Sequence, residues 1–278
     1  MRACSLTLGL AALLLGVAAP ARAQGVLVAP HAVYLDHRTR SAAITLYNPG
    51  TEPTEVAISA IYGYPVTDSA GHFTLYLPDS VEAGMPAATG WVEAFPRRMT
   101  IPPLTKQTVR LLARPPQGLA DGEYWSRVVI TAQGGSVPVT DADSNGISVG
   151  LNLEIRTIIP LLYRKGALRT GLAVSGVTAV PAGDSLAIRA HLARQGTAAW
   201  IGSVHGVLAD SSGREAASFT QPLAIYYEAE PVFALPVGGL APGRYRLRLD
   251  FATERDDILP ELVLRAPAVR DSVDVRLP

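Results

Sequence analysis

The sequence predicts an all-β protein made of two β-sandwich domains, and three observations lead to this fold class. Short runs of β-branched, leucine and tyrosine residues recur along the chain, separated by turns that use many of its 25 glycines and 22 prolines. Beyond the first 23 residues, no apolar repeat with a helical period of 3.6 extends over about a dozen residues. A segment of the form G-L-A-x-G-x-Y occurs once in each half of the chain. With 48% hydrophobic residues the chain can bury a core, so a disordered protein is excluded.

The first 23 residues have the features of a secretory signal peptide. Arg2 precedes an apolar run over residues 6–17, and residues 21–23 have the small-x-small form of a cleavage site. The run is too short to span a membrane, which takes about 20 residues. We expect cleavage after Ala23 and an exported protein without a membrane span. Cleavage also removes Cys4, the only cysteine, which precedes the apolar run and is therefore not expected to carry a lipid anchor.

Five runs in the first half of the mature chain have the composition and length of strands. Turn sequences lie between them, among them residues 48–50 and residues 79–80. The expected strands comprise residues 26–28, 43–47, 56–61, 73–77 and 108–112.

The repeated segment predicts a particular kind of sandwich. Residues 118–124 and residues 239–245 both end in a tyrosine that lies directly before a strand-like run. Tyr124 and Tyr245 therefore have the position of the tyrosine corner of immunoglobulin-type domains, where the hydroxyl group bonds to upstream backbone. A generic glycine-x-tyrosine turn is the alternative. Two copies in one chain favour one immunoglobulin-like domain in each half.

A break in the strand pattern indicates the domain boundary. The pattern stops near residues 164–166 and a new series begins at Leu168. After the signal peptide, we therefore expect an N-terminal domain over residues 24–164 and a C-terminal domain over residues 165–278.

Charge and histidine spacing argue against several classes of function. The chain has 24 basic and 24 acidic residues, so it lacks the broad basic surface of a nucleic-acid-binding protein. The five histidines show no metal-ligand spacing, and no glycine-rich phosphate loop is present. A mature chain without cysteine also has no disulfide and no thiolate ligand. We expect no metal and no cofactor.

Two motifs resemble functional sites but lack the necessary context. Residues 146–150 match the G-x-S-x-G pattern of serine hydrolases, but an alternating strand follows Ser148 where that enzyme class requires a helix. Residues 141–146 match the start of a calcium loop, but its twelfth position is Asn152, which lacks the bidentate carboxylate of such loops. We expect a polar loop and a protein that is not an enzyme.

One strand carries the functional argument. From residue 147 to residue 156, apolar and polar side chains alternate with a period of two. This strand is either the last core strand of a sandwich or an edge strand that presents its apolar side chains to a partner. The apolar positions are Ile147, Val149, Leu151, Leu153 and Ile155.

This part of the chain resembles the PapD-like periplasmic pilus chaperones. Residues 151–164 are similar to the last strand of the first domain and the interdomain junction of that family, which end in a comparable apolar-apolar-Tyr-Arg sequence. The order of further segments agrees: residues 28–30, residues 44–48, the two prolines that precede residues 107–111, and the corner at residues 121–124. The resemblance covers about residues 25–165 and is weaker in the second half.

The resemblance implies a periplasmic chaperone with two immunoglobulin-like domains in a boomerang arrangement. Such a protein binds pilin-like pilus (fimbrial) subunits by β-augmentation, lending its edge strand to a subunit that lacks one, and it can work with an outer-membrane usher. The matching residues are Leu151, Leu153 and Ile155, extended by Val149 and Ile147. An exposed apolar edge also favours self-association. The alternatives are an exported structural or adhesive protein of two sandwich domains and an exported hydrolase that uses Ser148.

The family also implies a cationic anchor for the terminal carboxylate of the subunit, and here the sequence departs from the pattern. The usual lysine position is occupied by Pro160, and the usual arginine position lies near Pro30 and His31. Proline has neither a charge nor an N–H donor. Arginines remain as substitutes because guanidinium binds carboxylate in bidentate fashion. The candidate anchors are Arg156, Arg40 and Arg38, and Arg164 matches the junction arginine that the family uses for interdomain pairing.

Overall fold

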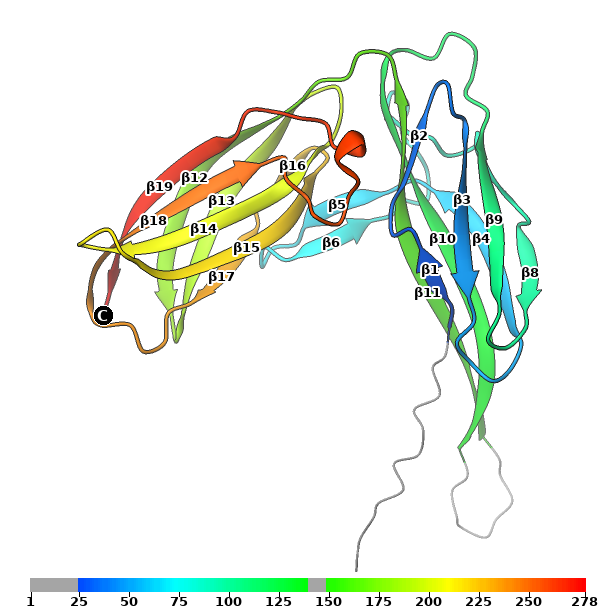
Figure 1. Cartoon of the computed structure of the whole chain (residues 1–278), viewed down its shortest axis with the longest axis horizontal. Helices are drawn as coiled ribbons and strands as arrows, with labels where there is room; N and C mark the ends of the chain where they lie inside the picture. The colour runs from blue at the N-terminus through cyan, green and yellow to red at the C-terminus, as the bar shows by residue number, and fades with distance from the viewer. Residues whose placement is uncertain (1–24, 140–148) are drawn as a thin grey trace, which may run out of the picture.

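The computed structural model describes residues 25–139 and 149–278. Within these residues the chain forms strands β1 to β19 and one short 3-10 helix, η1 (Pro260–Leu262). The strands build two β-sandwich domains that meet at an angle (Figure 1). The predicted all-β fold with two sandwich domains is therefore confirmed. The signal peptide, Ile147, Ser148 and the loop over residues 141–146 lie outside the described residues.

The N-terminal domain consists of two sheets that face each other across one core. The first contains, in spatial order, β1 (Leu27–Ala29), β3 (Ser41–Tyr47), β9 (Lys106–Ala113) and β7 (Val92–Phe95). The second contains β2 (Val33–Asp36), β11 (Val149–Lys165), β10 (Gly122–Val139), β4 (Thr54–Ile61) and β8 (Arg98–Ile101). Alternate residues of each strand point inward, so Ile44 and Leu111 from one sheet meet Ile130 and Leu161 from the other in a buried cluster.

The chain changes sheets near its N-terminus. β1 pairs antiparallel with β3 in the first sheet, and β2 pairs in parallel with β11 in the second. The crossing occurs at residues 30–32, where Pro30 lacks the N–H group needed to continue a strand ladder. As a result, β2 covers only a short part of the outer edge of β11.

The C-terminal domain repeats the sandwich arrangement with a second core. One sheet contains β12 (Thr170–Ala182), β13 (Ser185–Gly196) and β16 (Glu228–Ala229), with β17 (Val232–Pro236) also paired to β13. The other contains β15 (Glu215–Ile225), β14 (Trp200–Asp210), β18 (Gly243–Ala252) and β19 (Val269–Leu277). Ile188 and Leu192 from the first sheet pack with Leu208 and Phe251 from the second.

The two tyrosine corners are confirmed. The Tyr124 hydroxyl donates to the Ala120 carbonyl oxygen over 2.9 Å, and the Tyr245 hydroxyl donates to the Ala241 carbonyl oxygen over 2.8 Å. The same local sequence therefore forms the same four-residue bridge in both domains. All five strands expected in the first half are also present, as β1, β3, β4, β6 (Phe73–Tyr76) and β9.

A hairpin from the N-terminal half packs on the C-terminal domain. β6 pairs with β5 (Tyr64–Thr67), and the two form a separate sheet that extends toward the second domain (Figure 1). The Val232 amide donates to the Gly71 carbonyl oxygen over 3.0 Å, and the Glu230 amide donates to the Thr67 hydroxyl oxygen over 2.8 Å. Phe73 packs against the second core. The hairpin therefore helps to fix how the two domains meet.

Aromatic side chains fill the junction between the domains. Trp125, Tyr62 and Tyr226 are buried there with Leu162 and Ala199. The Trp125 ring lies edge-on to the Tyr226 ring, with centroids 4.6 Å apart. The two domains are therefore joined by a packed aromatic cluster.

Candidate functional site

The outer edge of β11 is open along most of its length. β11 pairs with β10 from residue 149 to residue 165, but on its other side β2 pairs only with residues 161–164. Among the described residues, no strand pairs with that side of residues 149–160. Pro160 lies at the point where the cover begins, a position that is typical for proline at a sheet edge. Every second residue of this open segment therefore presents unpaired backbone groups.

The β10–β11 ribbon also extends beyond the sandwich. β4 pairs with β10 only as far as Gln133, so the ribbon beyond that residue has two strands (Figure 1). A two-stranded ribbon outside a sandwich buries little surface of its own. The open edge is therefore accessible to a partner at the level of the ribbon.

The apolar row of β11 passes from buried to exposed along the strand. Ile159, Leu161 and Tyr163 are buried in the core of the N-terminal domain. Leu153 and Ile155 have the same parity and lie on the same face, but Leu153 is 40% exposed and Ile155 is half-buried. The core-strand interpretation therefore describes residues 159–163, and the partner-binding interpretation fits Leu153.

Other parts of the chain lie beside the remaining predicted positions of this row. The Ile155 methyl group Cδ1 lies 3.0 Å from where a Cβ at Gly25 would be, so Ile155 packs against the start of the described chain. The backbone of Val149 and Leu151 continues β11 opposite Val139 and Val137.

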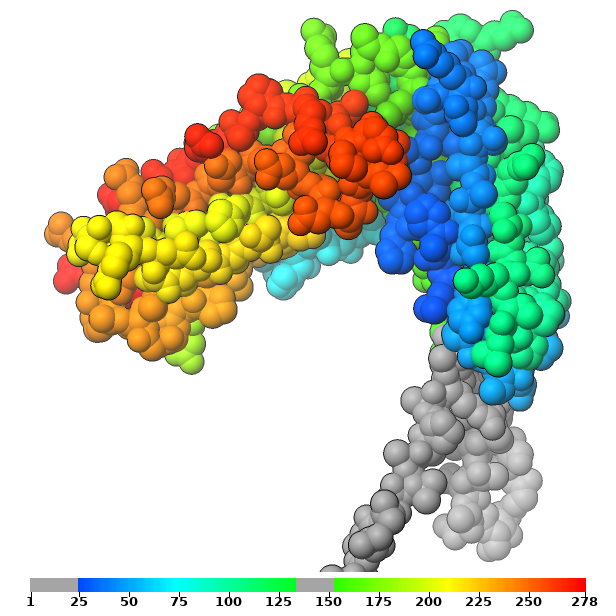
Figure 2. Space-filling model, viewed as in Figure 1, coloured from blue at the N-terminus to red at the C-terminus, as the bar shows by residue number. Residues whose placement is uncertain are grey.

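A cleft of about 620 Å³ lies between the domains, next to the covered end of β11. It is lined by residues 30–34 of the N-terminal domain and by residues from the segment 255–262 of the C-terminal domain, in the region where the two domains approach each other (Figure 2). Its walls are mostly apolar and aromatic, which is typical of ligand sites of this size. Its lining includes Tyr34, Leu75, Arg127, Pro160, Tyr226 and Arg255.

Arg127 is the cation of this cleft that has no counter-ion. It is only 5% exposed, its Nε donates to the Gly63 carbonyl oxygen over 3.0 Å, and its guanidinium group lies 5.1 Å from the centre of the Tyr226 ring. Its Nη2 atom is buried and has no hydrogen-bond partner. No Asp or Glu carboxylate of the described chain forms an ion pair with it. A buried, uncompensated charge is costly, so this geometry indicates a site for an anion.

Arg255 also lines the cleft, but its charge is already compensated. Its Nε and Nη2 atoms donate to the two carboxylate oxygens of Asp257 over 2.7 and 2.6 Å. These side-chain hydrogen bonds lower the pKa of Asp257 below its usual value and keep the pair ionised. Arg255 is therefore less available to an incoming anion than Arg127.

The arginines predicted as anchors lie elsewhere. Arg40 donates from Nε to the His37 carbonyl oxygen over 3.1 Å, and Arg38 is exposed on the same connection between β2 and β3. Arg156 pairs with Glu154 at 2.7 Å on the exposed part of β11. None of the three is among the residues that line the cleft. Arg127 was missed, although it is the single charged residue in the otherwise apolar or neutral run over residues 125–130, which is an unusual position for an arginine.

Arg164 connects the two domains. Its Nε donates to Glu123 Oε2 over 2.8 Å, and its Nη1 donates to the Leu262 carbonyl oxygen over 2.5 Å. Its guanidinium group also lies 4.7 Å from the centre of the Tyr34 ring. Through these contacts Arg164 joins β10 and β11 to the loop that carries η1.

The Glu123 carboxylate completes this junction. Its side chain is fully buried, and Oε1 accepts hydrogen bonds from the Ala199 amide and from Trp125 Nε1, both over 3.0 Å. A buried carboxylate with three donors is well compensated. Glu123 was not predicted from the sequence, because two of its three donors, Arg164 and Ala199, lie far from it along the chain.

The tyrosines of the cleft remain protonated at neutral pH. Burial raises the pKa of Tyr34 to about 12, and burial also raises the pKa of Tyr226. Both hydroxyl groups are therefore neutral, and neither supplies a counter-charge to Arg127.

Within residues 25–139 and 149–278, no group of three or more His, Cys, Asp or Glu side chains is arranged to hold a metal ion. In the same part of the chain, the structure contains no helix that is long and apolar enough to cross a membrane.

Comparison with known proteins gives structural matches only. No family model matches the chain, and no curated protein matches it. A Salmonella enterica structure of the SafA pilin with the SafB chaperone is 14% identical, with a TM-score of 0.44 over 91% of this chain and 98% of that one. The CsuC-CsuE chaperone-adhesion subunit complex of Acinetobacter baumannii is 12% identical, with a TM-score of 0.45 over 90% of this chain and 97% of that one.

The E. coli chaperone DraB is 12% identical, with a TM-score of 0.40 over 81% of this chain and 91% of that one. Similarity at this level does not establish a function.

Proposed function

We propose that this chain is an exported, non-enzymatic chaperone that binds an incomplete β-sandwich subunit by adding the β11 edge to it. The observation that carries the proposal is the open edge over residues 149–160 with Leu153 exposed on it. In β-augmentation, backbone hydrogen bonds along the edge supply affinity, and alternate side chains in pockets fix the register. The chaperone would act in the periplasm on pilin-like subunits, as the resemblance of residues 151–164 implies.

Burial of the apolar row supplies part of the binding free energy. Leu153 and Ile155 are incompletely buried in the free protein, and complete burial of such a side chain contributes about 1.5–3 kcal/mol. Ordering of both partners offsets part of this gain. The same edge, left open, would pair with a second copy of the chain, which supports self-association when no subunit is present.

The cleft supports a second contact with the same subunit. Arg127 carries a buried, unpaired donor directly beside Pro160, where the open edge meets the cleft. We propose that it binds the terminal carboxylate of the subunit through a charge-assisted hydrogen bond. Arg127 would then take the role for which the sequence suggested Arg156, Arg40 or Arg38.

The Leu153→Glu variant tests the strand-donation proposal. A carboxylate at this position would have to be buried in the subunit, so we expect co-purification with a co-expressed pilin-like subunit from the same genome to fall at least tenfold. The matched control is Val180→Glu, which places the same charge on an exposed apolar residue of β12 in the other domain. Thermal unfolding of both variants should remain close to that of the parent protein.

Hydrogen exchange supplies an independent measurement. Amides on the open side of residues 153–160 should exchange rapidly in the free protein and become protected in the complex, whereas residues 161–164 are protected in both. The proposal is wrong if Leu153→Glu captures the subunit normally, or if this segment is already protected in the free monomer. A chain that captures no subunit and is found on the cell surface would instead be the structural or adhesive protein.

A further inference from the structure

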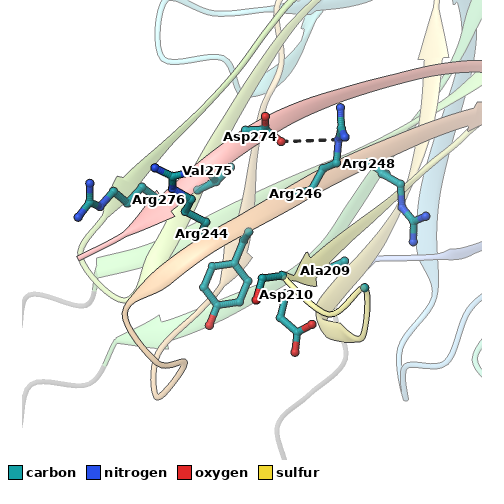
Figure 3. Close-up of a pocket in the computed structure, with 11 residues that line it drawn as sticks. Ala209, Asp210, Arg244, Arg246, Arg248, Asp274, Val275 and Arg276 are labelled. Atoms are coloured by element: carbon teal, nitrogen blue, oxygen red, sulfur yellow. Dashed lines mark ion pairs between the residues drawn. The ribbon is translucent and has the colours of Figure 1, made fainter.

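The C-terminal domain carries a basic hollow on its outer face, far along the chain from the open edge. The hollow has a volume of about 600 Å³ and lies over β18, β19 and the end of β14 (Figure 3). Leu247 and Leu249 point from β18 into the core, so the even-numbered residues 244, 246 and 248 point outward. Every outward position of β18 from residue 244 to residue 248 is an arginine.

Both acidic residues that line this hollow are already paired with arginines. Asp274 pairs with Arg246 at 3.6 Å, drawn as a dashed line in Figure 3, and Asp210 pairs with Arg214 at 3.1 Å. The Asp210 carboxylate also accepts hydrogen bonds from Ser212. These contacts leave neither aspartate free to pair with the remaining arginines.

Three arginines of the hollow have no acidic partner. Within the described ranges, no carboxylate forms an ion pair with Arg244, Arg248 or Arg276, although all three are exposed. The hollow thus carries an excess of about three positive charges on a chain whose basic and acidic residues balance. The excess is local and is not a consequence of overall composition.

The register places two of these charges directly opposite each other. Arg244 on β18 faces Arg276 on β19, and the two lie next to each other at one end of the hollow (Figure 3). Like charges at directly opposed positions destabilise a sheet. An anion bound between the two guanidinium groups would reverse this repulsion, because each group offers a planar fork of N–H donors.

We propose that this hollow binds a phosphate-bearing ligand, with one phosphate group held between Arg244 and Arg276. Guanidinium forks match phosphate oxygens in bidentate fashion, and the uncompensated charge of Arg248 adds to the attraction for an anion. The phosphate belongs either to a free phosphorylated molecule or to the headgroup of an anionic lipid. This site is independent of the edge of β11 and of the proposed chaperone function.

Calorimetric titration of the full chain with inorganic pyrophosphate at low salt tests the site. We expect binding that weakens as salt is added. The double variant Arg244→Ser/Arg276→Ser should weaken binding at least tenfold. The control is Arg98→Ser/Arg110→Ser, which removes two exposed arginines from the N-terminal domain and should change the affinity less than twofold.

Flotation with phosphatidylglycerol vesicles, and with phosphatidylcholine vesicles as the control, distinguishes the two sources. Binding of pyrophosphate alone assigns the site to a free ligand, and added binding of the anionic vesicles assigns it to a headgroup. The proposal is overturned if neither probe binds, if the two double variants behave alike, or if polyglutamate binds more tightly than pyrophosphate. The last result would identify an acidic protein segment as the ligand.

Discussion

Arg127 on β10 lies directly opposite Pro160 on β11. Pro160 occupies the position where the chaperone family that residues 151–164 resemble has a lysine. The neighbouring strand β10 carries a cation, Arg127, at the same level of the sheet. A side chain in either position reaches the interdomain cleft, because both residues line it. The strand register explains how the cleft keeps a positive charge although β11 does not supply it.

This relationship predicts the effect of Arg127→Met. The variant keeps the aliphatic volume but removes the buried charge, so subunit affinity should fall about tenfold to a hundredfold, given that a hydrogen bond to a charged group is worth about 1.5–3 kcal/mol. The free protein should be no less stable, since an uncompensated buried charge is removed. Binding titration together with urea unfolding measures both effects. Unchanged affinity would exclude Arg127 as the anchor.

Loss of Glu123 should destabilise the protein strongly. Glu123→Ala leaves Arg164 without its carboxylate and the Ala199 amide without its acceptor. Breaking a buried ion pair by removing one partner costs about 3–5 kcal/mol. The free energy of unfolding in urea should fall by that amount. Glu154→Ala, which removes an exposed ion pair with Arg156, is the control and should change stability by about 1 kcal/mol or less.

Replacement of Leu104 by glycine should stabilise the protein. It is 65% exposed and has a φ of 55°, a left-handed conformation that disfavours residues with a Cβ. Leu104→Gly should raise the free energy of unfolding by about 0.5 kcal/mol, because relief of about 1–2 kcal/mol of strain exceeds the entropic cost of glycine. Leu104→Ala keeps the Cβ and should give no gain. Equal stability of the two variants would show that the backbone at residue 104 is not strained by a Cβ.

The contribution of Asp210 to the stability of the fold should depend on pH. Hydrogen bonds from the Ser212 side chain and from the backbone amides of Ser212 and Arg214 lower the pKa of Asp210 from 3.8 to about 2. Because the folded-state pKa is depressed, the stabilisation is present above pH 4 and is lost as the pH falls through 2. Asp210→Asn should lower the melting temperature at pH 6, and its difference from the parent should shrink toward pH 2. A constant difference across this range would show that ionisation of Asp210 is not involved.

Local sequence was sufficient for the parts of this fold that depend on neighbouring residues. The two tyrosine corners follow from turns of four residues, so Tyr124 and Tyr245 were predicted from their segments alone. The period of two along β11 likewise predicted a strand, because side-chain alternation is a property of the strand itself. The same period did not show which of its residues are covered.

Pairing between segments that are distant in the chain determined the open edge, the position of the β5–β6 hairpin and the surroundings of Arg127. Only the tertiary structure shows that β2 pairs with residues 161–164 of β11 alone and leaves residues 149–160 open, since that depends on where the chain crosses between sheets. It also places the β5–β6 hairpin on the other domain and sets Arg127 opposite Pro160. The sequence by itself determined the strands, the corners and the apolar row of this protein. The edge, the cleft and the buried cation depend on contacts between residues far apart in the chain, which no local pattern encodes.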